Sequence, residues 1–169
     1  MDRALAKDEY KFGALRMTIL IVAERPDTAD AVMLIDELEQ HLAPFYPATS
    51  RHGYSVEKLI KQGVAFFVAR VDDVPAACGG VQFFGAEYGE LKRMFVRPQF
   101  RGLGLAKLML EHLEQYAREH GVYLLRLETG IHQKEAIGLY ERMGFQNIPP
   151  FGEYTDDPLS KFFEKKIGY

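Results

Sequence analysis

The chain contains little cysteine, no tryptophan and no long apolar run. Cys78 is the only cysteine among 169 residues, which excludes an intramolecular disulfide framework and a cysteine-rich zinc site. We interpret Cys78 as a small buried hydrophobic residue. A single cysteine fits a reducing compartment, so we expect a cytoplasmic protein. The early apolar run over residues 19–23 is too short to span a bilayer or to form the core of a signal peptide.

An excess of positive charge is lacking as well. The 21 Lys and Arg residues are offset by 24 Asp and Glu residues, and the formal net charge is −3. Proteins that bind nucleic acid or an anionic membrane usually show a basic excess, so we expect neither partner. The five histidines form no H-x-x-x-H pair or carboxylate cluster, and the sequence therefore predicts no metal site.

The length predicts one domain with a single core. Residues 1–16 are charged without clear periodicity, so we expect an N-terminal tail before a domain over residues 17–169, with Met17 as a candidate natural start. Asp27 is the expected first helix cap, and residues 72–75 form the expected hairpin turn. Hydrophobic spacing predicts strands near 18–23, 64–71, 76–84, 87–96, 122–129 and 160–167, and helices near 27–41, 56–61, 102–121 and 133–143.

The most informative segment connects the strand over 87–96 to the long helix. Gly102 and Gly104 remove side chains where a ligand would approach the backbone, and the first helical turn offers N–H donors and the positive end of the helix dipole. This arrangement suits a pyrophosphate. The dinucleotide fingerprint needs a third glycine where Lys107 stands, and a Walker A sequence is absent, so neither nucleotide-binding fold is favoured.

These residues resemble a known family, the GNAT superfamily of acetyl-coenzyme A dependent N-acetyltransferases. Arg101, Gly104 and Ala106 match its [QR]-x-x-G-x-[GA] signature, and residues 136–145 match its A-x-x-L-Y-x-x-x-G-F helix. The resemblance covers residues 87–145. It implies an α/β fold with a mixed, mainly antiparallel sheet and about four flanking helices, in which the strands over 87–96 and 122–129 splay apart at a bulge.

The resemblance further implies acetyl-coenzyme A as cosubstrate. The pantetheine arm would pair with the backbone of Met94, Phe95 and Val96, and Gln133 would line the thiol end on the same helical face as Tyr140. In the family an asparagine often stands where Gln133 does. The backbone N–H groups that would hold the pyrophosphate come from Arg101, Gly102, Leu103, Gly104, Leu105, Ala106 and Lys107.

The resemblance assigns the chemistry to three residues. Tyr140 would donate a proton to the departing thiolate. The acceptor amine must first lose a proton, and either Glu90, the favoured candidate, or Glu128 aligns with a family base; an ordered water is the third option. Either glutamate needs partial burial to raise its pKa. Lys92 and Arg93 would point to opposite faces of a regular strand, and an ion pair with Glu90 or Glu87 is their simplest interpretation.

The predicted function is transfer of an acetyl group to a primary amine. Phe45, Tyr46 and Tyr54, with the loop over residues 151–154, would frame the acceptor, and the nearby acidic residues favour a small amine such as an amino acid or a polyamine over a protein lysine or N-terminus. The alternative is a catalytically silent module that binds coenzyme A as a sensor. A homodimer is compatible with either function.

Overall fold

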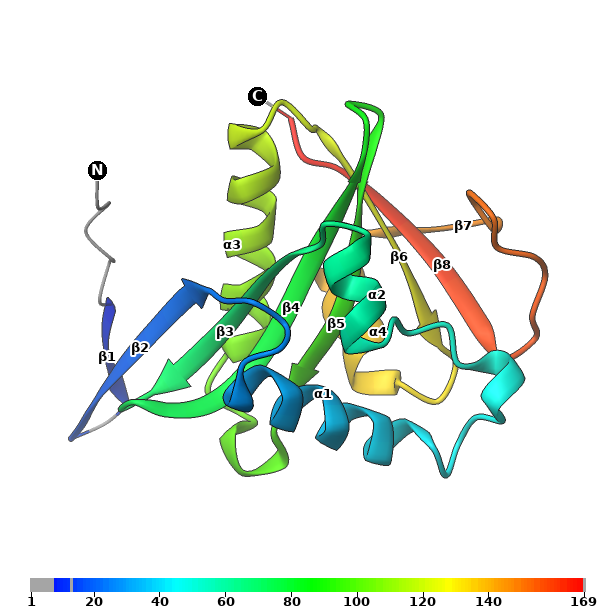
Figure 1. Ribbon diagram of the computed structural model, residues 1–169. Coiled ribbons are helices and arrows are strands. Elements are labelled where there is room, and N and C mark those ends of the chain that lie inside the picture. The colour runs from blue at the N-terminus through cyan, green and yellow to red at the C-terminus, as the bar shows by residue number, and fades with distance from the viewer. Residues whose placement is uncertain (1–7, 13, 169) are drawn as a thin grey trace.

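Apolar residues at period-two spacing form one open sheet of eight strands in the computed structural model, which describes residues 8–12 and 14–168 (Figure 1). The strand order is β1-β2-β3-β4-β5-β6-β8-β7, and β5 and β6 are its one parallel pair in the described part of the chain. The strands are β1 Asp8–Phe12, β2 Leu15–Ala23, β3 Ala65–Val71, β4 Val74–Phe84, β5 Tyr88–Val96, β6 Leu124–Gly130, β7 Gln146–Ile148 and β8 Ser160–Lys166.

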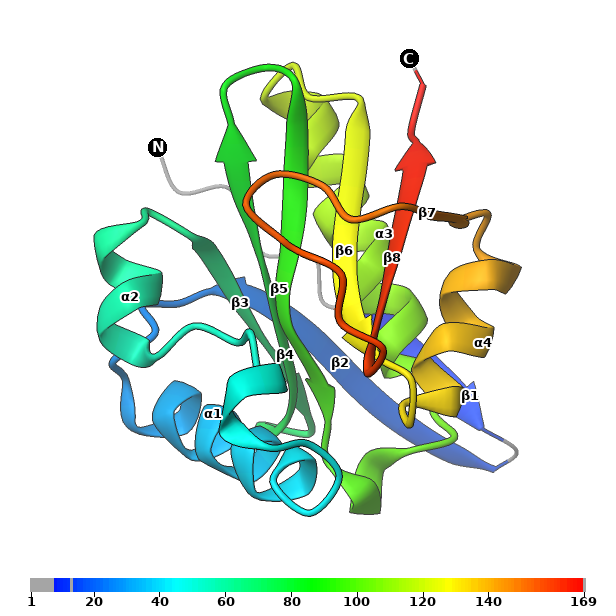
Figure 2. The same cartoon turned by 90° about the vertical axis from the view of Figure 1, so that its right-hand side faces the viewer.

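In the described part of the chain, four α-helices cover the two faces of the sheet, as expected for the predicted fold class (Figures 1 and 2). In β3, Phe66 and Val68 pack against α1 and α2, whereas Phe67 and Ala69 pack with the cluster beneath α3 and α4. Alternate strand residues thus supply two separate cores. The helices are α1 Ala29–Leu42, α2 Val56–Lys61, α3 Leu105–Glu119 and α4 Lys134–Arg142. Within the described residues, no helix has the length and apolarity needed to cross a membrane.

Several local predictions need correction. Thr28 caps α1, since its side chain accepts a hydrogen bond from the Ala31 N–H at 3.3 Å, while Asp27 pairs with Arg25 instead. The helix α3 begins at Leu105 and not near Gly102, because Gly102 and Gly104 have φ of +83° and +77°, outside the right-handed helical region. The hairpin turn is made by two residues with positive φ, so β4 begins before the predicted residue 76.

Part of the predicted N-terminal tail lies in the sheet. β1 pairs with β2 in antiparallel register, from Asp8 opposite Ile19 to Phe12 opposite Leu15, and so covers an edge that β2 would otherwise leave unpaired. Residues 1–7 of the predicted tail lie outside the described residues, and the start of the domain at residue 17 stays a prediction.

The strands β5 and β6 separate soon after they meet. Their pairing is confined to Gly89 with Leu125 and Glu90 with Arg126, and the splay predicted for these two strands is confirmed. A bulge lies in β5 beyond this point, because the register with β4 shifts between Cys78 and Gly80. At the bulge Arg93 has φ of +56°, a conformation that costs a residue with a Cβ on the order of 1–3 kcal/mol.

Candidate active site

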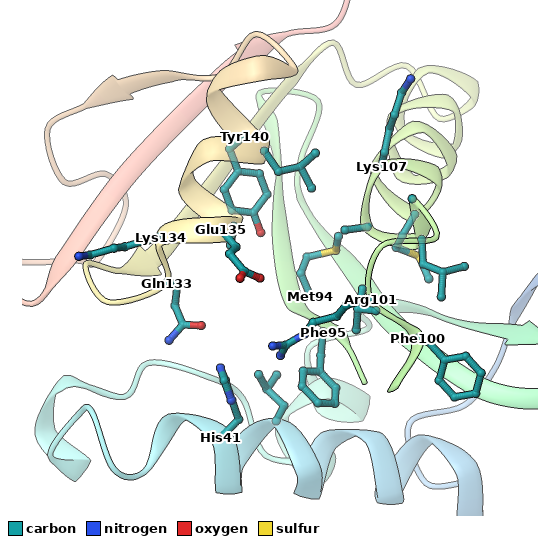
Figure 3. A pocket seen from close by; sticks show the side chains of 18 of the residues that line it. His41, Met94, Phe95, Phe100, Arg101, Lys107, Gln133, Lys134, Glu135 and Tyr140 are labelled. Carbon is teal, nitrogen blue, oxygen red and sulfur yellow. The ribbon is translucent and has the colours of Figure 1, made fainter. Parts of the chain in front are cut away.

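A cavity of about 520 Å³ lies between the end of β5 and the first turns of α3 and α4 (Figure 3). It brings together every residue predicted to bind the cosubstrate except Leu103, which packs against the core. The residues brought together are Met94, Phe95, Val96, Arg101, Gly102, Gly104, Leu105, Ala106, Lys107, Gln133 and Tyr140.

The glycine turn leaves its backbone open at the cavity. A Cβ built on Gly102 or Gly104 would have no described atom within 4 Å. The first helical hydrogen bond of α3 runs from the Leu108 N–H to the Gly104 carbonyl at 3.1 Å. The N–H groups of residues 105–107 precede this bond, so the helix itself supplies no carbonyl acceptor for them. Arg101 and Lys107 also line the cavity and add positive charge to it. The chain therefore fits a ligand with a phosphate group at one end.

The C-terminal cap of α4 positions Tyr140. Phe145 donates its N–H to the Tyr140 carbonyl at 2.9 Å, and Gly144, with φ of +91°, donates to Glu141 at 3.0 Å. This is a Schellman motif, and its hydrophobic contact is the Phe145 ring, which meets the Tyr140 ring edge-on with centroids 5.6 Å apart. The Tyr140 hydroxyl points into the cavity (Figure 3). Burial and then the charge of Glu128 raise the pKa of Tyr140, which stays protonated.

A second cavity, of about 130 Å³, adjoins the first. Five residues line both: Leu38, Met94, Gln133, Ala136 and Tyr140. Glu90, Glu128, Lys92 and Tyr154 line the second cavity but not the first. The candidate acid therefore stands at the junction, with both candidate bases on the side of the smaller cavity.

Glu90 is held by two partners. Its side chain is 3% exposed, and its Oε1 accepts hydrogen bonds from the Lys92 ammonium at 2.7 Å and from the Tyr154 hydroxyl. The Lys92 ammonium also lies 3.9 Å from the centre of the Tyr54 ring. Burial lowers the pKa of Lys92, and the charge of Glu90 opposes that effect. The ion pair expected between Lys92 and Glu90 is present.

Glu128 has fewer partners. It lies near the end of β6, is partly buried, and accepts a hydrogen bond from the Ser160 hydroxyl of β8 at 2.8 Å. Burial and the charge of Glu90 raise the pKa of Glu128, while the Ser160 hydrogen bond and the nearby His52 and Lys92 side chains oppose that effect. A carboxylate whose pKa is raised by burial is better suited to take a proton near neutral pH than an exposed one.

Comparison with known proteins identifies the family. Residues 35–145 match the acetyltransferase (GNAT) family. The chain belongs to this family. It is 41% identical to an IAA acetyltransferase of Azospirillum brasilense over 150 residues, covering 88% of this chain and 98% of the relative.

Solved structures support the same assignment. A Klebsiella pneumoniae protein assigned as an acyl-CoA N-acyltransferase matches with a TM-score of 0.74 and 34% identity, over 89% of this chain and 98% of the other. The PaiA N-acetyltransferase of Thermoplasma acidophilum, solved with coenzyme A, shares the fold at 18% identity and a TM-score of 0.69, over 88% of this chain and 98% of that one. The GNAT chain described here is thus an acyltransferase.

The loop after α1 positions the start of α4 in this GNAT chain. The Tyr46 hydroxyl accepts hydrogen bonds from the His132 N–H at 2.9 Å and from the Gln133 amide at 3.4 Å. The Tyr46 ring packs so closely on Gly130 that a Cβ there would lie 2.1 Å from ring atoms. Of the aromatics expected around the acceptor, Tyr46 lines the smaller cavity, Phe45 the larger one, and Tyr54 covers Lys92.

The sequence assigned no role to Arg51 or His52, which line the smaller cavity, and it did not indicate the contact of Tyr154 with Glu90. Tyr154 reaches Glu90 from the segment between β7 and β8, which crosses in front of β5 and β6 (Figure 2). Arg51 and His52 come from the loop before α2. Tyr154 and Glu90 are 64 residues apart, so no local spacing could have shown the contact. The left-handed conformation of Arg93 likewise has no signal in its own sequence.

Proposed function

We propose that this GNAT chain transfers the acetyl group of acetyl-coenzyme A directly to a primary amine of a small molecule. The observation that carries the proposal is the meeting of two cavities at Tyr140, one lined by the open glycine turn and N-terminus of α3 and one lined by two glutamates. The smaller cavity has about 130 Å³, below the roughly 300–1,000 Å³ typical of ligand pockets. Its size favours a small acceptor over a protein segment.

Acetyl-coenzyme A supplies an activated acetyl thioester when bound. The N–H groups at the start of α3 would hold its pyrophosphate, and the backbone of Met94, Phe95 and Val96 would align its pantetheine arm. The bulge in β5 turns backbone groups away from β4, and one such N–H can stabilise the negative charge that develops on the thioester oxygen. These contacts would orient the acetyl carbon toward the smaller cavity.

We assign proton removal to Glu128. The sequence favours Glu90, but Glu90 already accepts from Lys92 and Tyr154, and a proton on Glu90 would leave a buried lysine without its counter-charge. Glu128 lacks such a pair and has a raised pKa. In this assignment Glu128 takes the proton of the ammonium group, and Glu90 positions Lys92 and Tyr154.

Tyr140 completes the transfer by donating its proton to the departing sulfur. A phenol with an ordinary pKa near 10 and a thiol near 8.5 exchange a proton at modest cost, and burial penalises both charged forms alike. The buried hydroxyl and the adjacent carboxylate also speak against a module that only binds coenzyme A, since binding requires neither group.

The direct test incubates the protein with acetyl-coenzyme A and pools of primary amines. We expect thiol release that depends on an added amine, together with the acetylated amine detected by mass spectrometry. Coenzyme A binding without turnover of any amine would favour the sensor function. Acetylation of peptide N-termini or lysines, with small amines untouched, would contradict the assigned acceptor class.

A further inference from the structure

Two arginines line the smaller cavity and share a single carboxylate. The Arg93 side chain, 4% exposed, pairs through its Nη2 with Glu39 of α1, and Arg51 lies 3.5 Å from the same carboxylate. Two guanidinium charges thus meet one carboxylate charge. The Nε atoms of Arg51 and Arg93 are buried, and neither has an acceptor among the described residues.

The backbone conformation of Arg93 determines where its side chain lies. On a regular strand Arg93 would face the α3 side, opposite Lys92, as the sequence predicts. The left-handed φ of +56° at the bulge instead turns it to the α1 side, where it meets Glu39 on the face that carries Lys92. A strained arginine and a bulge together place this guanidinium beside the acceptor cavity.

Gly53 makes room for the guanidinium. A Cβ on Gly53 would lie 2.0 Å from Arg93 Nη1 and 2.7 Å from Cζ, so any side chain there would displace the group. Gly53 itself is exposed and does not have a positive φ, so its backbone conformation does not require glycine. The absence of a side chain at Gly53 therefore leaves room for the Arg93 guanidinium in the wall of the smaller cavity.

A buried donor without an acceptor is costly unless a ligand satisfies it. The ligand group that suits a planar guanidinium is a carboxylate, which accepts two hydrogen bonds in one plane. Glu128, which would receive the amine, projects from β6, while Arg93 belongs to β5, so the two charges lie on the two splayed strands. One small cavity thus offers a site for an ammonium group and a site for a carboxylate.

We propose that the acceptor is an amino acid, with its amine beside Glu128 and its carboxylate bound by Arg93 and Arg51. This inference rests on the proposed function and narrows its substrate class. A polyamine would place a second ammonium group against the guanidinium groups, and like charges at close range repel. A peptide N-terminus would present an uncharged amide in place of the carboxylate.

The test compares three matched acceptors: a free amino acid, its carboxamide, and the amine left after removal of the carboxyl group. Across the amino acids that are turned over, we expect kcat/KM for the free acid to exceed that for the amide by about 10²-fold. Arg93→Gln should raise KM for the acid to a similar extent, reduce this preference to within a few-fold, and leave acetyl-coenzyme A affinity unchanged by calorimetry.

Arg97→Gln is the matched control. Arg97 follows β5 and binds Glu37 of α1 through its Nε at 2.9 Å, but it lines neither cavity. This variant should keep the preference for the free acid. If Arg93→Gln fails to fold, Gly53→Ala at the exposed position and Arg51→Gln give the same comparison.

The outcomes separate the two proposals. Equal turnover of acid, amide and simple amine by the wild type would overturn the amino acid assignment and leave the acetyltransferase proposal intact. A preference for the free acid that persists in both Gly53→Ala and Arg51→Gln would overturn the assignment to these arginines. If no amine of any class is acetylated, the proposed function fails, and the acceptor assignment fails with it.

Discussion

At the scale of single residues, two side chains of the same type differ in chemical role because their hydrogen-bond and ion-pair partners differ. Glu90 and Glu128 both line the smaller cavity, yet Glu90 is enclosed by Lys92 and Tyr154, whereas Glu128 accepts a hydrogen bond from Ser160. Burial keeps Tyr140 protonated beside Glu128. Glu128 and Tyr140, which have raised pKa values and are not bound to Lys92, are therefore the residues that we propose to move protons.

Replacing Tyr140 tests the acid. Tyr140→Phe keeps the ring that packs on Phe145 and removes only the hydroxyl, so turnover should fall by about 10²-fold or more while the unfolding midpoint changes little. Steady-state rates on a good acceptor and thermal unfolding measure the two effects. Tyr88→Phe, which removes a buried hydroxyl outside both cavities, should keep full turnover. Turnover of Tyr140→Phe within a few-fold of wild type would make Tyr140 a packing residue.

Replacing each glutamate tests the base. Because a base acts only when deprotonated, kcat/KM should be lost as pH falls through the raised pKa of Glu128, at a pH above the roughly 4.3 of an ordinary glutamate. Glu128→Gln should lower the rate and remove this limb of the pH profile without changing acetyl-coenzyme A affinity.

Glu90→Gln is the comparison variant. This variant should keep the acidic limb of the pH profile. It should raise KM for the acceptor instead, because Lys92 and Tyr154 lose the carboxylate that holds them in place. If Glu90→Gln removed the limb and Glu128→Gln preserved it, our assignment of the two residues would be reversed.

At the scale of elements, helix ends build the site. The start of α3 faces the larger cavity because Gly102 and Gly104 adopt positive φ, which turns the chain from the short 3₁₀ turn Pro98–Phe100 into the helix. The end of α4 orients Tyr140 through its Schellman motif. The N-terminus of α3 would therefore bind an anion, and the C-terminus of α4 orients the hydroxyl that we propose as the proton donor.

A side chain at Gly104 should abolish coenzyme A binding. In Gly104→Val the added atoms would occupy the open space where the phosphates would lie, so calorimetry should detect no binding. Gly121→Val is the matched control, since Gly121 has φ of +74° with similar open space at the other end of α3. Both variants should lose on the order of 1–2 kcal/mol of unfolding free energy from strain, but only Gly104→Val should lose binding. Normal affinity in folded Gly104→Val would contradict the pyrophosphate assignment.

At the scale of the whole molecule, long-range contacts close the site. The sheet leaves a gap where β5 and β6 diverge, and three distant segments surround it: the loop between α1 and α2, the helix α4, and the segment between β7 and β8 (Figure 2). Each segment is tied to the sheet or to another segment by side-chain hydrogen bonds such as Tyr46 to His132 and Tyr154 to Glu90. Acceptor recognition therefore depends on the integrity of the fold.

Global stability should depend on pH through His112. Its ring meets Phe67 edge-on at 4.5 Å, its Nε2 is buried without a partner among the described residues, and burial lowers its pKa. Below the unfolded pKa of about 6.5, the unfolded chain binds a proton at His112 that the folded chain does not bind. The contribution of neutral His112 to the free energy of unfolding is therefore complete above pH 6.5, and it is lost as pH falls toward the lower pKa of the folded state.

Denaturant unfolding at several pH values measures this dependence. One group contributes at most about 1.4 kcal/mol per pH unit. His112→Leu should flatten the curve below pH 6.5. An identical slope in wild type and His112→Leu would show that His112 does not carry the effect.

Local sequence determined the main elements and the glycine turn before α3, while the other residues of the larger cavity were expected from the family resemblance. Period-two and helical spacing, the caps at Gly121 and Gly144, and the turn around Gly104 act over a few residues, so the main strands, the four described helices and the glycine turn before α3 were predictable. The short strand β7 was not predicted, because its three residues are half-exposed or exposed and depend on pairing with β8. The strand β1 likewise depends on its pairing with β2.

Only the tertiary structure decided how the acceptor side is built. The bulge turns Arg93 to the same face as Lys92, against the alternation that a regular strand would impose. Tyr154 comes to Glu90 across 64 residues, and Arg51 from a loop and Arg93 from β5 share Glu39 of α1. Such contacts arise from strand order, register and loop paths. These depend on the packing of the whole chain, and the spacing of neighbouring residues does not encode them.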